Sequence, residues 1–282
     1  MNTENIEEDQ YMIPKVIHYC WFGGNPLPEL EQKCIASWKK YCPDYEIIEW
    51  NETNYDVNKC AYMKEAYQAK KWSFVSDCAR FDIIYHHGGI YLDTDVEIIR
   101  NIDEFLKNCA FMGFENEDYV NPGLIFGGKK ENGEIECILR WYETHHFLKE
   151  SGEIDLTTNP VIVTRILEER GLRKEQTIQV LNDSLTVYPK DYFCPMDYDT
   201  GEVTITDNTA SIHRYAASWL EPKTRKWVQI GWKISQSVPL RIYRMVTKSH
   251  LYALIGIFYT KGMKYGIKFY AQKIRDRIHS DK

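Results

Sequence analysis

Short apolar segments that alternate with amphipathic ones constrain the fold of this chain more than any other feature. Residues 15–21, KVIHYCW, form a compact apolar run that ends at Gly23-Gly24, which is typical of a buried strand followed by a tight loop. Residues 30–41 have the spacing of an amphipathic helix, and residues 45–50, YEIIEW, predict a second strand. Because a strand–helix–strand unit builds a parallel sheet, we predict an α/β fold with a mostly parallel central sheet flanked by helices.

The same alternation continues along the chain. Residues 72–87 give the strongest helical pattern, with aromatic residues and Cys78 along one stripe, and Gly88-Gly89 ends it. Residues 90–93 then predict a short apolar strand. Further helices are predicted at residues 59–71, 134–149 and 159–170, and further short strands within residues 110–127 and 177–215.

The charge of the chain is divided unevenly. Residues 240–282 carry ten Lys/Arg against two Asp/Glu, a net charge of +8, whereas residues 1–239 carry 25 against 39, a net charge of −14. An acidic body argues against general nucleic-acid binding. The bases of the tail alternate with apolar residues, which suits either a basic amphipathic helical segment on an anionic membrane or helices packed on the core. We therefore expect a flexible lead at residues 1–12, a folded domain at 13–239 and a basic amphipathic helical tail at 240–282.

Cysteine spacing and targeting signals bear on the compartment. None of the eight cysteines has C-x-x-C spacing, so a zinc knuckle or a redox motif is not expected. The opening MNTENIEEDQ is acidic and lacks the apolar stretch of a signal peptide, and no apolar run is long enough to predict a membrane span. We expect a reducing, cytoplasmic location, at the inner face of the membrane if the tail binds lipid.

Two carboxylates follow the predicted strand at residues 90–93. Asp93 and Asp95 stand two residues apart, so in an extended backbone they point to the same side and could share one divalent cation. Mg²⁺ or Mn²⁺ takes oxygen ligands and stabilises the charge that builds on a departing diphosphate. Two solvated loop acids are the alternative.

A second pair of charges stands on the predicted helix at residues 72–87. Asp77 and Arg80 are separated by three residues and therefore share one face of that helix. They could reach over the edge of the sheet to sugar hydroxyls. An exposed helix salt bridge, which contributes little to stability, is the alternative.

These residues resemble a known family. The string SDCARFDIIYHHGGIYLDTDV, residues 76–96, is similar to the signature of glycosyltransferase family 32, which includes the yeast initiating mannosyltransferase and bacterial capsule and lipopolysaccharide transferases. The glucosyltransferase domain of the clostridial toxins has a similar arrangement. IPKVIHYCWFGG, residues 13–24, resembles the family's opening block, and the two blocks together cover roughly residues 13–107. The resemblance implies a GT-A fold, with residues 13–239 as the catalytic domain.

The resemblance also implies roles for individual residues. Asp93 and Asp95 would form the DXD metal motif with His213, and Mn²⁺ or Mg²⁺ would be the metal. Asp77 and Arg80 would act on the donor sugar. The donor-binding residues would be Trp21, Phe22 and Gly23 of the opening block, Asp77, Arg80, Tyr91, and Ser218 and Trp219 near the end of the domain. Asn121-Pro122-Gly123 and Thr158-Asn159-Pro160 stand near the acceptor in the family, and both could also be simple turns.

The function implied is a retaining, metal-dependent transfer of a sugar from a nucleotide-sugar donor to a glycan or lipid-linked glycan acceptor in surface polysaccharide synthesis. A UDP-sugar is favoured as donor by the toxin-like resemblance. A GDP-mannose-dependent mannosyltransferase and a non-catalytic sugar-nucleotide-binding protein are the alternatives. A nucleotidyltransferase would be expected to carry a glycine-rich phosphate loop with lysine, which the sequence lacks.

Overall fold

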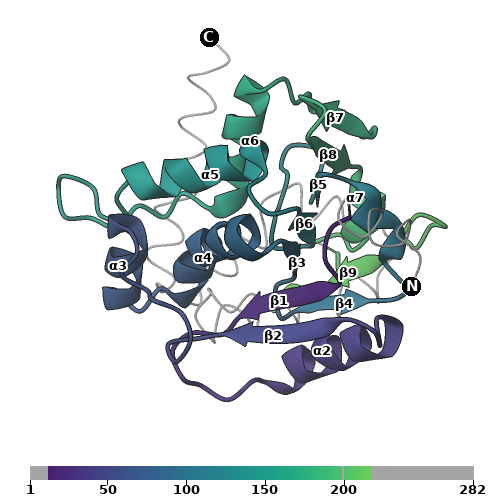
Figure 1. Cartoon of the computed structure of the whole chain (residues 1–282), viewed down its shortest axis with the longest axis horizontal. Coiled ribbons are helices and arrows are strands. Elements are labelled where there is room, and N and C mark those ends of the chain that lie inside the picture. The colour runs from purple at the N-terminus through teal and green to yellow at the C-terminus, as the bar shows by residue number, and fades with distance from the viewer. Residues whose placement is uncertain (1–11, 199, 217–282) are drawn as a thin grey trace, which may run out of the picture. The chain divides into compact units, whose positions relative to one another are not determined.

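The computed structural model describes residues 12–198 and 200–216 of the chain (Figure 1). By its internal contacts the chain divides into two units, and the first holds residues 12–196 and 204–216 of the described part, with every element named below. The predicted lead, residues 1–12, lies outside the described residues except for Met12, and the predicted tail lies wholly outside them.

A seven-stranded sheet forms the centre of this unit. Its strands in spatial order are β2 (Glu46–Trp50), β1 (Val16–Cys20), β3 (Gly89–Tyr91), β6 (Phe126–Gly128), β5 (Ala110–Gly113), β8 (Leu185–Tyr188) and β7 (Gln179–Leu181). β1 is parallel to both β2 and β3, and β5 is parallel to β8, whereas β6 and β7 run antiparallel to their neighbours. Five of the seven strands therefore point the same way, which confirms the predicted mostly parallel sheet.

Helices cover both faces of the sheet. The helices of the described chain are α2 (Glu29–Tyr41), α3 (Ala61–Gln68), α4 (Trp72–His87), the 3₁₀ turn η1 (Asp103–Lys107), α5 (Gly133–Thr144), α6 (Asn159–Glu169) and α7 (Lys190–Phe193). On β1, Tyr19 contacts Trp38 of α2, while Cys20 belongs to the same core cluster as Cys78 of α4. Because successive strand residues point to opposite faces, α2 and α4 lie on opposite sides of the sheet. Among the described helices, none is long and apolar enough to cross a membrane.

The predicted helix at residues 134–149 was too long at its C-terminal end. α5 ends at Thr144, and the chain then forms a small hairpin in which Leu148 pairs with Ile154. Glu65 of α3 accepts hydrogen bonds from the backbone N–H groups of Phe147 and Leu148, at 2.9 and 3.0 Å. These N–H groups bond a distant carboxylate instead of helix carbonyls, which local spacing could not reveal.

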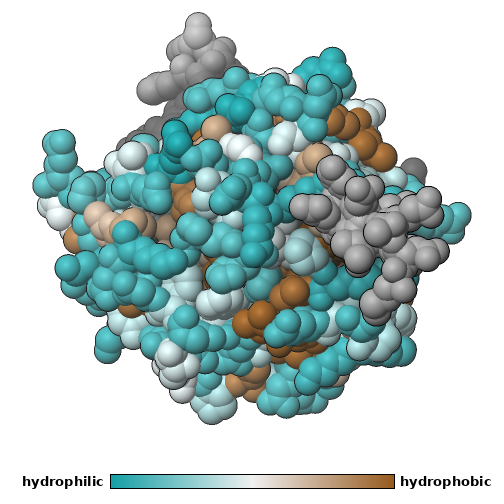
Figure 2. Space-filling model, in the orientation of Figure 1, coloured by the Kyte–Doolittle hydropathy of each residue, from teal (hydrophilic) through white to brown (hydrophobic). Residues whose placement is uncertain are grey.

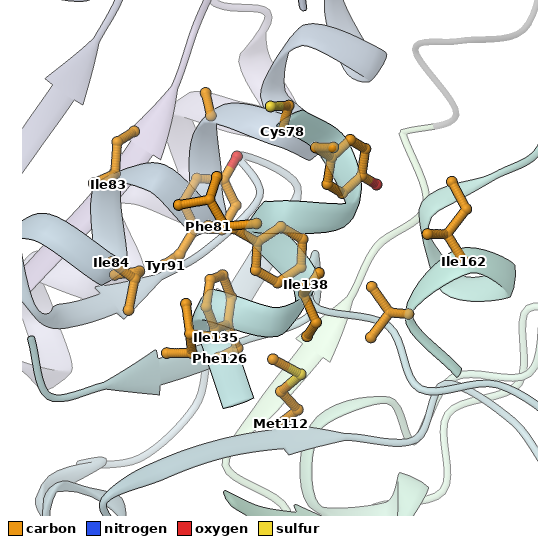
Figure 3. Close-up of a cluster of buried hydrophobic side chains, with 14 of the residues drawn as sticks. Cys78, Phe81, Ile83, Ile84, Tyr91, Met112, Phe126, Ile135, Ile138 and Ile162 are labelled. Atoms are coloured by element: carbon orange, nitrogen blue, oxygen red, sulfur yellow. The ribbon is translucent and has the colours of Figure 1, made fainter. Parts of the chain in front are cut away.

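The main hydrophobic core lies between the sheet and the pair α4 and α5. α4 packs across β1, β3 and β6 and is flanked by α3 and α5 (Figure 1). In Figure 3, Phe81 and Ile84 of α4 point toward Ile135 and Ile138 of α5, with Phe126 beneath them. α4 is therefore a buried helix whose position is fixed by packing, and so are the charged residues that it carries.

The face of the molecule drawn in Figure 2 is mainly polar. Figure 2 shows that most of this face is hydrophilic, with hydrophobic residues gathered in small groups. Two of the exposed large hydrophobic residues, Ile178 and Val180, stand at or next to the edge strand β7. Scattered groups of this size are common on folded proteins.

A second, two-stranded sheet joins the middle of the chain to its later part. β4 (Val96–Ile98) pairs antiparallel with β9 (Ser211–His213), and Val96 is directly opposite His213. β4 begins one residue after Asp95. This pairing brings the histidine of β9 to the end of the DXD segment, although more than a hundred residues separate them in the sequence.

The link from α4 to β3 depends on Gly89, whose φ is +103°. A Cβ atom there would lie 2.8 Å from the Val16 carbonyl oxygen and 2.9 Å from His18 Nε2. We expect Gly89→Ala to lower the free energy of unfolding by about 2 kcal/mol or more, because backbone strain and steric overlap act together. Urea unfolding measures this change.

Gly133→Ala is the matched control for that substitution. Gly133 begins α5, and a Cβ atom there would meet nothing within 4 Å. Its stability should be unchanged or rise by up to about 1 kcal/mol, since alanine favours helix. Equal unfolding free energies for the two variants would contradict the close approach at Gly89.

Candidate functional site

The DXD segment leaves β3 in a turn. The Asp93 N–H donates to the Gly123 carbonyl at 3.0 Å, and the Val96 N–H donates back to the Asp93 carbonyl at 3.1 Å. The extended backbone expected through Asp93 and Asp95 is therefore wrong, because a turn closes between Asp93 and Val96. The two carboxylates still lie close enough to interact, and Asp95 disfavours the charged form of Asp93.

Arg80 holds two carboxylates together. Its Nη2 lies 2.9 Å from Asp77 Oδ1 and 3.0 Å from Asp93 Oδ1, and its Nε donates to the Ser76 carbonyl. The side chain is only 3% exposed. The shared helix face predicted for Asp77 and Arg80 is confirmed, but the exposed salt bridge considered as the alternative is wrong because α4 is buried.

Tyr91 contacts both Arg80 and Asp93. Its hydroxyl donates to Asp93 Oδ1 at 3.1 Å, and the Arg80 guanidinium lies 4.8 Å from the centre of its ring. Tyr91 is 1% exposed, so it acts as a buried support for the DXD motif. A cation over an aromatic face is favourable, particularly away from water.

Asn121 and Gly123, which the resemblance places near the acceptor, lie against the Asp93 carboxylate. The Gly123 N–H donates to Asn121 Oδ1 at 2.7 Å. A Cβ atom at Gly123 would overlap Asp93 Oδ2 and lie 3.0 Å from Arg80 Nη1. This loop therefore presses its backbone against the Asp93 carboxylate. The Asn-Pro-Gly triplet was the available signal, because glycine permits such a close approach.

Asp95 pairs with His213, as the β4–β9 register dictates. His213 Nε2 lies 3.3 Å from Asp95 Oδ2, and the Ala216 N–H donates to the same oxygen at 2.8 Å. Burial opposes both charges, but each partner favours the other's charged form. As a result the pKa of Asp95 is lowered and that of His213 is raised well above its usual range.

The other two carboxyl groups behave differently. Burial raises the pKa of Asp77 to about 7, although the Arg80 charge acts against that shift. Burial also raises the pKa of Asp93, again against Arg80. Three carboxyl groups, those of Asp77, Asp93 and Asp95, lie beside two cationic side chains, Arg80 and His213, so a further cation would be stabilised there.

The donor set suits a hard or borderline divalent cation. Asp93 and Asp95 offer the carboxylate oxygens that Mg²⁺ and Mn²⁺ prefer, and His213 could add an imidazole nitrogen, which suits Mn²⁺ better than Mg²⁺, once it has lost its proton. His213 Nδ1 is buried and has no hydrogen-bond partner among residues 12–198 and 200–216. Within that same part of the chain, no three such side chains already converge as a finished metal site. The residues therefore fit the metal in kind, and its predicted ligands stay a prediction.

The opening block lies at the end of β1. Trp21 follows the strand directly, is half-buried, and donates from its indole Nε1 to the Asn25 carbonyl at 2.5 Å. Phe22 instead packs in the core against Tyr55, so only its backbone is available to a donor. Gly23, with φ of +91°, leaves room for the indole of Trp72 and donates its N–H to Glu52 Oε1.

Two predicted site residues cannot be placed. Ser218 and Trp219 lie outside the described residues, which end at Ala216 in this region.

Asn159, at the start of α6, is buried and donates to the Tyr142 hydroxyl at 2.7 Å. Its amide thus ties α6 to α5 near Asp77.

Residues 28–112 match a family model described as the glycosyltransferase sugar-binding region containing the DXD motif. Residues 28–112 are therefore similar to the sugar-binding region of glycosyltransferases that contain a DXD motif. The matched range contains Asp77, Arg80, Asp93 and Asp95, the residues that the structure brings together. The predicted resemblance to glycosyltransferase family 32 is thereby confirmed, as is the α/β fold expected of it.

Curated relatives agree with this assignment. The chain is 29% identical over 111 residues to inositol phosphoceramide mannosyltransferase 1 of Schizosaccharomyces pombe, a match that covers 36% of this chain and 33% of the relative. It is 32% identical over 123 residues to the mannosyl phosphorylinositol ceramide synthase CSH1 of Saccharomyces cerevisiae, covering 39% and 30%. The chain thus spans about a third of the length of these relatives.

Among solved structures, the PaToxG glycosyltransferase resembles the chain with 18% identity and a TM-score of 0.41, over 59% of this chain and 76% of that one.

The raised pKa of Asp77 predicts a pH-dependent stability. The folded chain keeps this proton up to about pH 7, whereas the unfolded chain releases it near pH 4. The stabilising contribution of protonated Asp77 is therefore complete below pH 4 and lost as the pH rises through 7. We expect Asp77→Asn to be more stable than the wild type at pH 8, by on the order of 1–3 kcal/mol, and the gain to shrink at pH 5.

Urea unfolding at the two pH values measures this difference. Asp118→Asn, at an exposed loop position, is the control and should match the wild type at both. A lower stability of Asp77→Asn at pH 8 would show that the Asp77–Arg80 ion pair outweighs the burial of the carboxylate.

Proposed function

We propose that this chain transfers a sugar from a nucleotide-sugar donor to an acceptor hydroxyl, with a divalent metal held by Asp93, Asp95 and His213. One observation carries the proposal most directly. β1 and β3 are parallel neighbours, and Trp21 follows the end of the first while the DXD segment follows the end of the second. Ligands of α/β proteins bind outside the carboxyl ends of such strands.

Each residue of the site then has a role that follows from its position. Trp21 would stack on the nucleotide base, and Gly23, packed against Trp72, would hold the turn that carries Trp21. Arg80 fixes Asp77 and Asp93, so their carboxyl groups are oriented before a donor arrives. Asp77, with a pKa of about 7, can donate or accept a hydrogen bond with a donor-sugar hydroxyl at neutral pH. A bound Mn²⁺ or Mg²⁺ would act as a Lewis acid on the departing diphosphate.

Ser218 and Trp219 complete the proposal on the diphosphate side. They follow β9 by a few residues, and β9 already carries His213 to Asp95. Their hydroxyl and indole N–H could donate to phosphate oxygens. Retention of configuration, which family membership suggests, needs no additional nucleophile if departure of the leaving group and attack occur on one face.

Two kinds of donor sugar are candidates. The toxin-like resemblance favours a UDP-sugar, whereas the fungal relatives are named as mannosyltransferases and so favour mannose. A donor panel of UDP-sugars and GDP-mannose, read by nucleotide release, separates the two. The acceptor is proposed to be a glycan or lipid-linked glycan in surface polysaccharide or lipopolysaccharide synthesis. A non-catalytic sugar-nucleotide-binding protein would bind the donor without releasing nucleotide.

The location proposed is cytoplasmic, with peripheral contact to an anionic membrane through residues 240–282. The support for that contact is the charge of the segment, +8 against −14 for residues 1–239. Each basic residue near such a surface contributes about 1 kcal/mol at most, and salt weakens the effect.

Metal dependence is the central test of the proposed function. EDTA should abolish nucleotide release from the donor, and Mn²⁺ or Mg²⁺ should restore it. Asp95→Asn, which keeps an acceptor for the Ala216 N–H, should reduce turnover by on the order of 100-fold, since a Lewis acid contributes several kcal/mol. Asp118→Asn is again the exposed control. Full turnover in excess EDTA would exclude the metal-dependent mechanism.

Base stacking by Trp21 is tested by nucleotide affinity. Trp21→Ala should weaken UDP binding about fivefold in calorimetry, because a stacked aromatic pair contributes about 1 kcal/mol. Trp21→Phe keeps an aromatic face and should bind more tightly than the alanine variant. If Trp21→Ala loses folding stability but binds UDP with unchanged affinity, Trp21 is a core residue.

A further inference from the structure

Two cysteines from different helices meet beside the proposed donor site. Cys60 is the N-cap of α3 and Cys78 lies in the first half of α4, with their sulfur atoms 3.6 Å apart. They are 18 residues apart in the sequence, so no short sequence motif predicts their contact. Among the remaining six cysteines, all within the described chain, no second pair of sulfurs is hydrogen-bonded.

The two thiols have unequal surroundings. Cys60 is partly exposed and accepts the Met63 N–H at the start of α3, while Cys78 is 1% exposed. The hydrogen bond from Cys78 lowers the pKa of Cys60 to about 7, burial opposes that shift, and the Met63 N–H assists it. A thiolate at a helix N-terminus is the usual attacking group in disulfide exchange, and a buried neighbour is suited to resolve the intermediate.

We propose that Cys60 and Cys78 form a redox-active dithiol that exchanges with small-molecule disulfides of the glutathione type. The Cys60 thiolate attacks one sulfur of oxidised glutathione, which forms a mixed disulfide and releases one glutathione thiol. Cys78 then attacks Cys60 Sγ, and the second glutathione leaves as its thiol. The two cysteine protons end on the two glutathione molecules. The protein is oxidised to a Cys60–Cys78 disulfide and one oxidised glutathione is reduced to two thiols.

Disulfide formation changes the geometry of α4. A disulfide has sulfur atoms about 2.05 Å apart, so the two sulfurs must approach by roughly 1.5 Å. Cys78 follows Asp77 directly and precedes Arg80 by two residues on the same buried helix. Oxidation therefore draws α4 toward the start of α3 and shifts Asp77 relative to the DXD segment. This effect on activity rests on the proposed function, whereas formation of the disulfide does not.

The test begins with the folded full-length chain in buffers of increasing oxidised-to-reduced glutathione ratio. After alkylation of free thiols and proteolysis, mass spectrometry should find the peptides of Cys60 and Cys78 linked, with both thiols lost together and recovered by dithiothreitol. Cys60→Ser should remove the link while keeping the cap of α3, since serine is a favoured N-cap residue. Cys109→Ser removes an exposed cysteine elsewhere and should link as the wild type does.

The effect of oxidation on the site is then measured as nucleotide release from the sugar donor that the donor panel identifies. Oxidised wild type should turn over roughly tenfold more slowly or worse, as expected for a displacement of about 1 Å, and dithiothreitol should restore it. Cys60→Ser should keep its turnover in the same oxidant. If Cys60 stays free, or is only glutathionylated, in oxidising buffer, the dithiol proposal is wrong. A linked protein with unchanged turnover would overturn the coupling to α4. If only the proposed function is wrong, the reduced wild type will show no turnover but will still form the Cys60–Cys78 disulfide in oxidising buffer.

Discussion

The buried contact between Arg80 and the two carboxylates is the interaction on which the site depends. Arg80 is almost completely removed from water, and burial of a charge is costly unless hydrogen bonds and opposite charges compensate it. Asp77 and Asp93 provide the charges, and the Tyr91 ring provides a favourable face. The same guanidinium therefore joins α4 to the DXD segment after β3. Because both elements are packed in the core, Arg80 holds the two carboxyl groups in fixed positions.

A second junction completes the site from the far end of the sequence. β9 pairs with β4 so that His213 lies opposite Val96, one residue after Asp95. The backbone on either side strengthens the contact, since the Arg214 N–H donates to the Asp95 carbonyl and the Ala216 N–H to its carboxylate. Asp95 therefore holds Arg214 and Ala216 in place, while Asp93 is held by Arg80 of α4. One short turn between two aspartates links both halves of the site.

The sequence predicted the sheet well because its strands are short and apolar and its helices carry clear periodicity. It also identified Asp77, Arg80, Asp93, Asp95 and His213, which the structure brings together. It could not predict that Asp93 and Asp95 stand in a turn, because the Asp93 N–H at the start of that turn is bonded to the carbonyl of Gly123, thirty residues later. The early end of α5 had the same kind of cause, a distant Glu65 carboxylate that takes the backbone N–H groups. Contacts between segments that are remote in the sequence determine both the backbone at Asp93 and the end of α5, and the local spacing of residues does not reveal such contacts.

The excess of acidic side chains and their burial explain why this site would favour a cationic ligand. Three carboxyl groups lie beside one buried arginine and one histidine, and burial raises the pKa values of Asp77 and Asp93 although Arg80 acts against that shift. Burial of these acids has a cost even though each has a cationic partner, because desolvation penalises the charged form of every carboxyl group. A divalent cation would supply the missing positive charge and at the same time bind a diphosphate. The desolvation cost of these acids and the proposed affinity for a metal–nucleotide complex would thus have the same origin, the arrangement of Asp77 and Asp93 around Arg80 and of Asp95 beside His213.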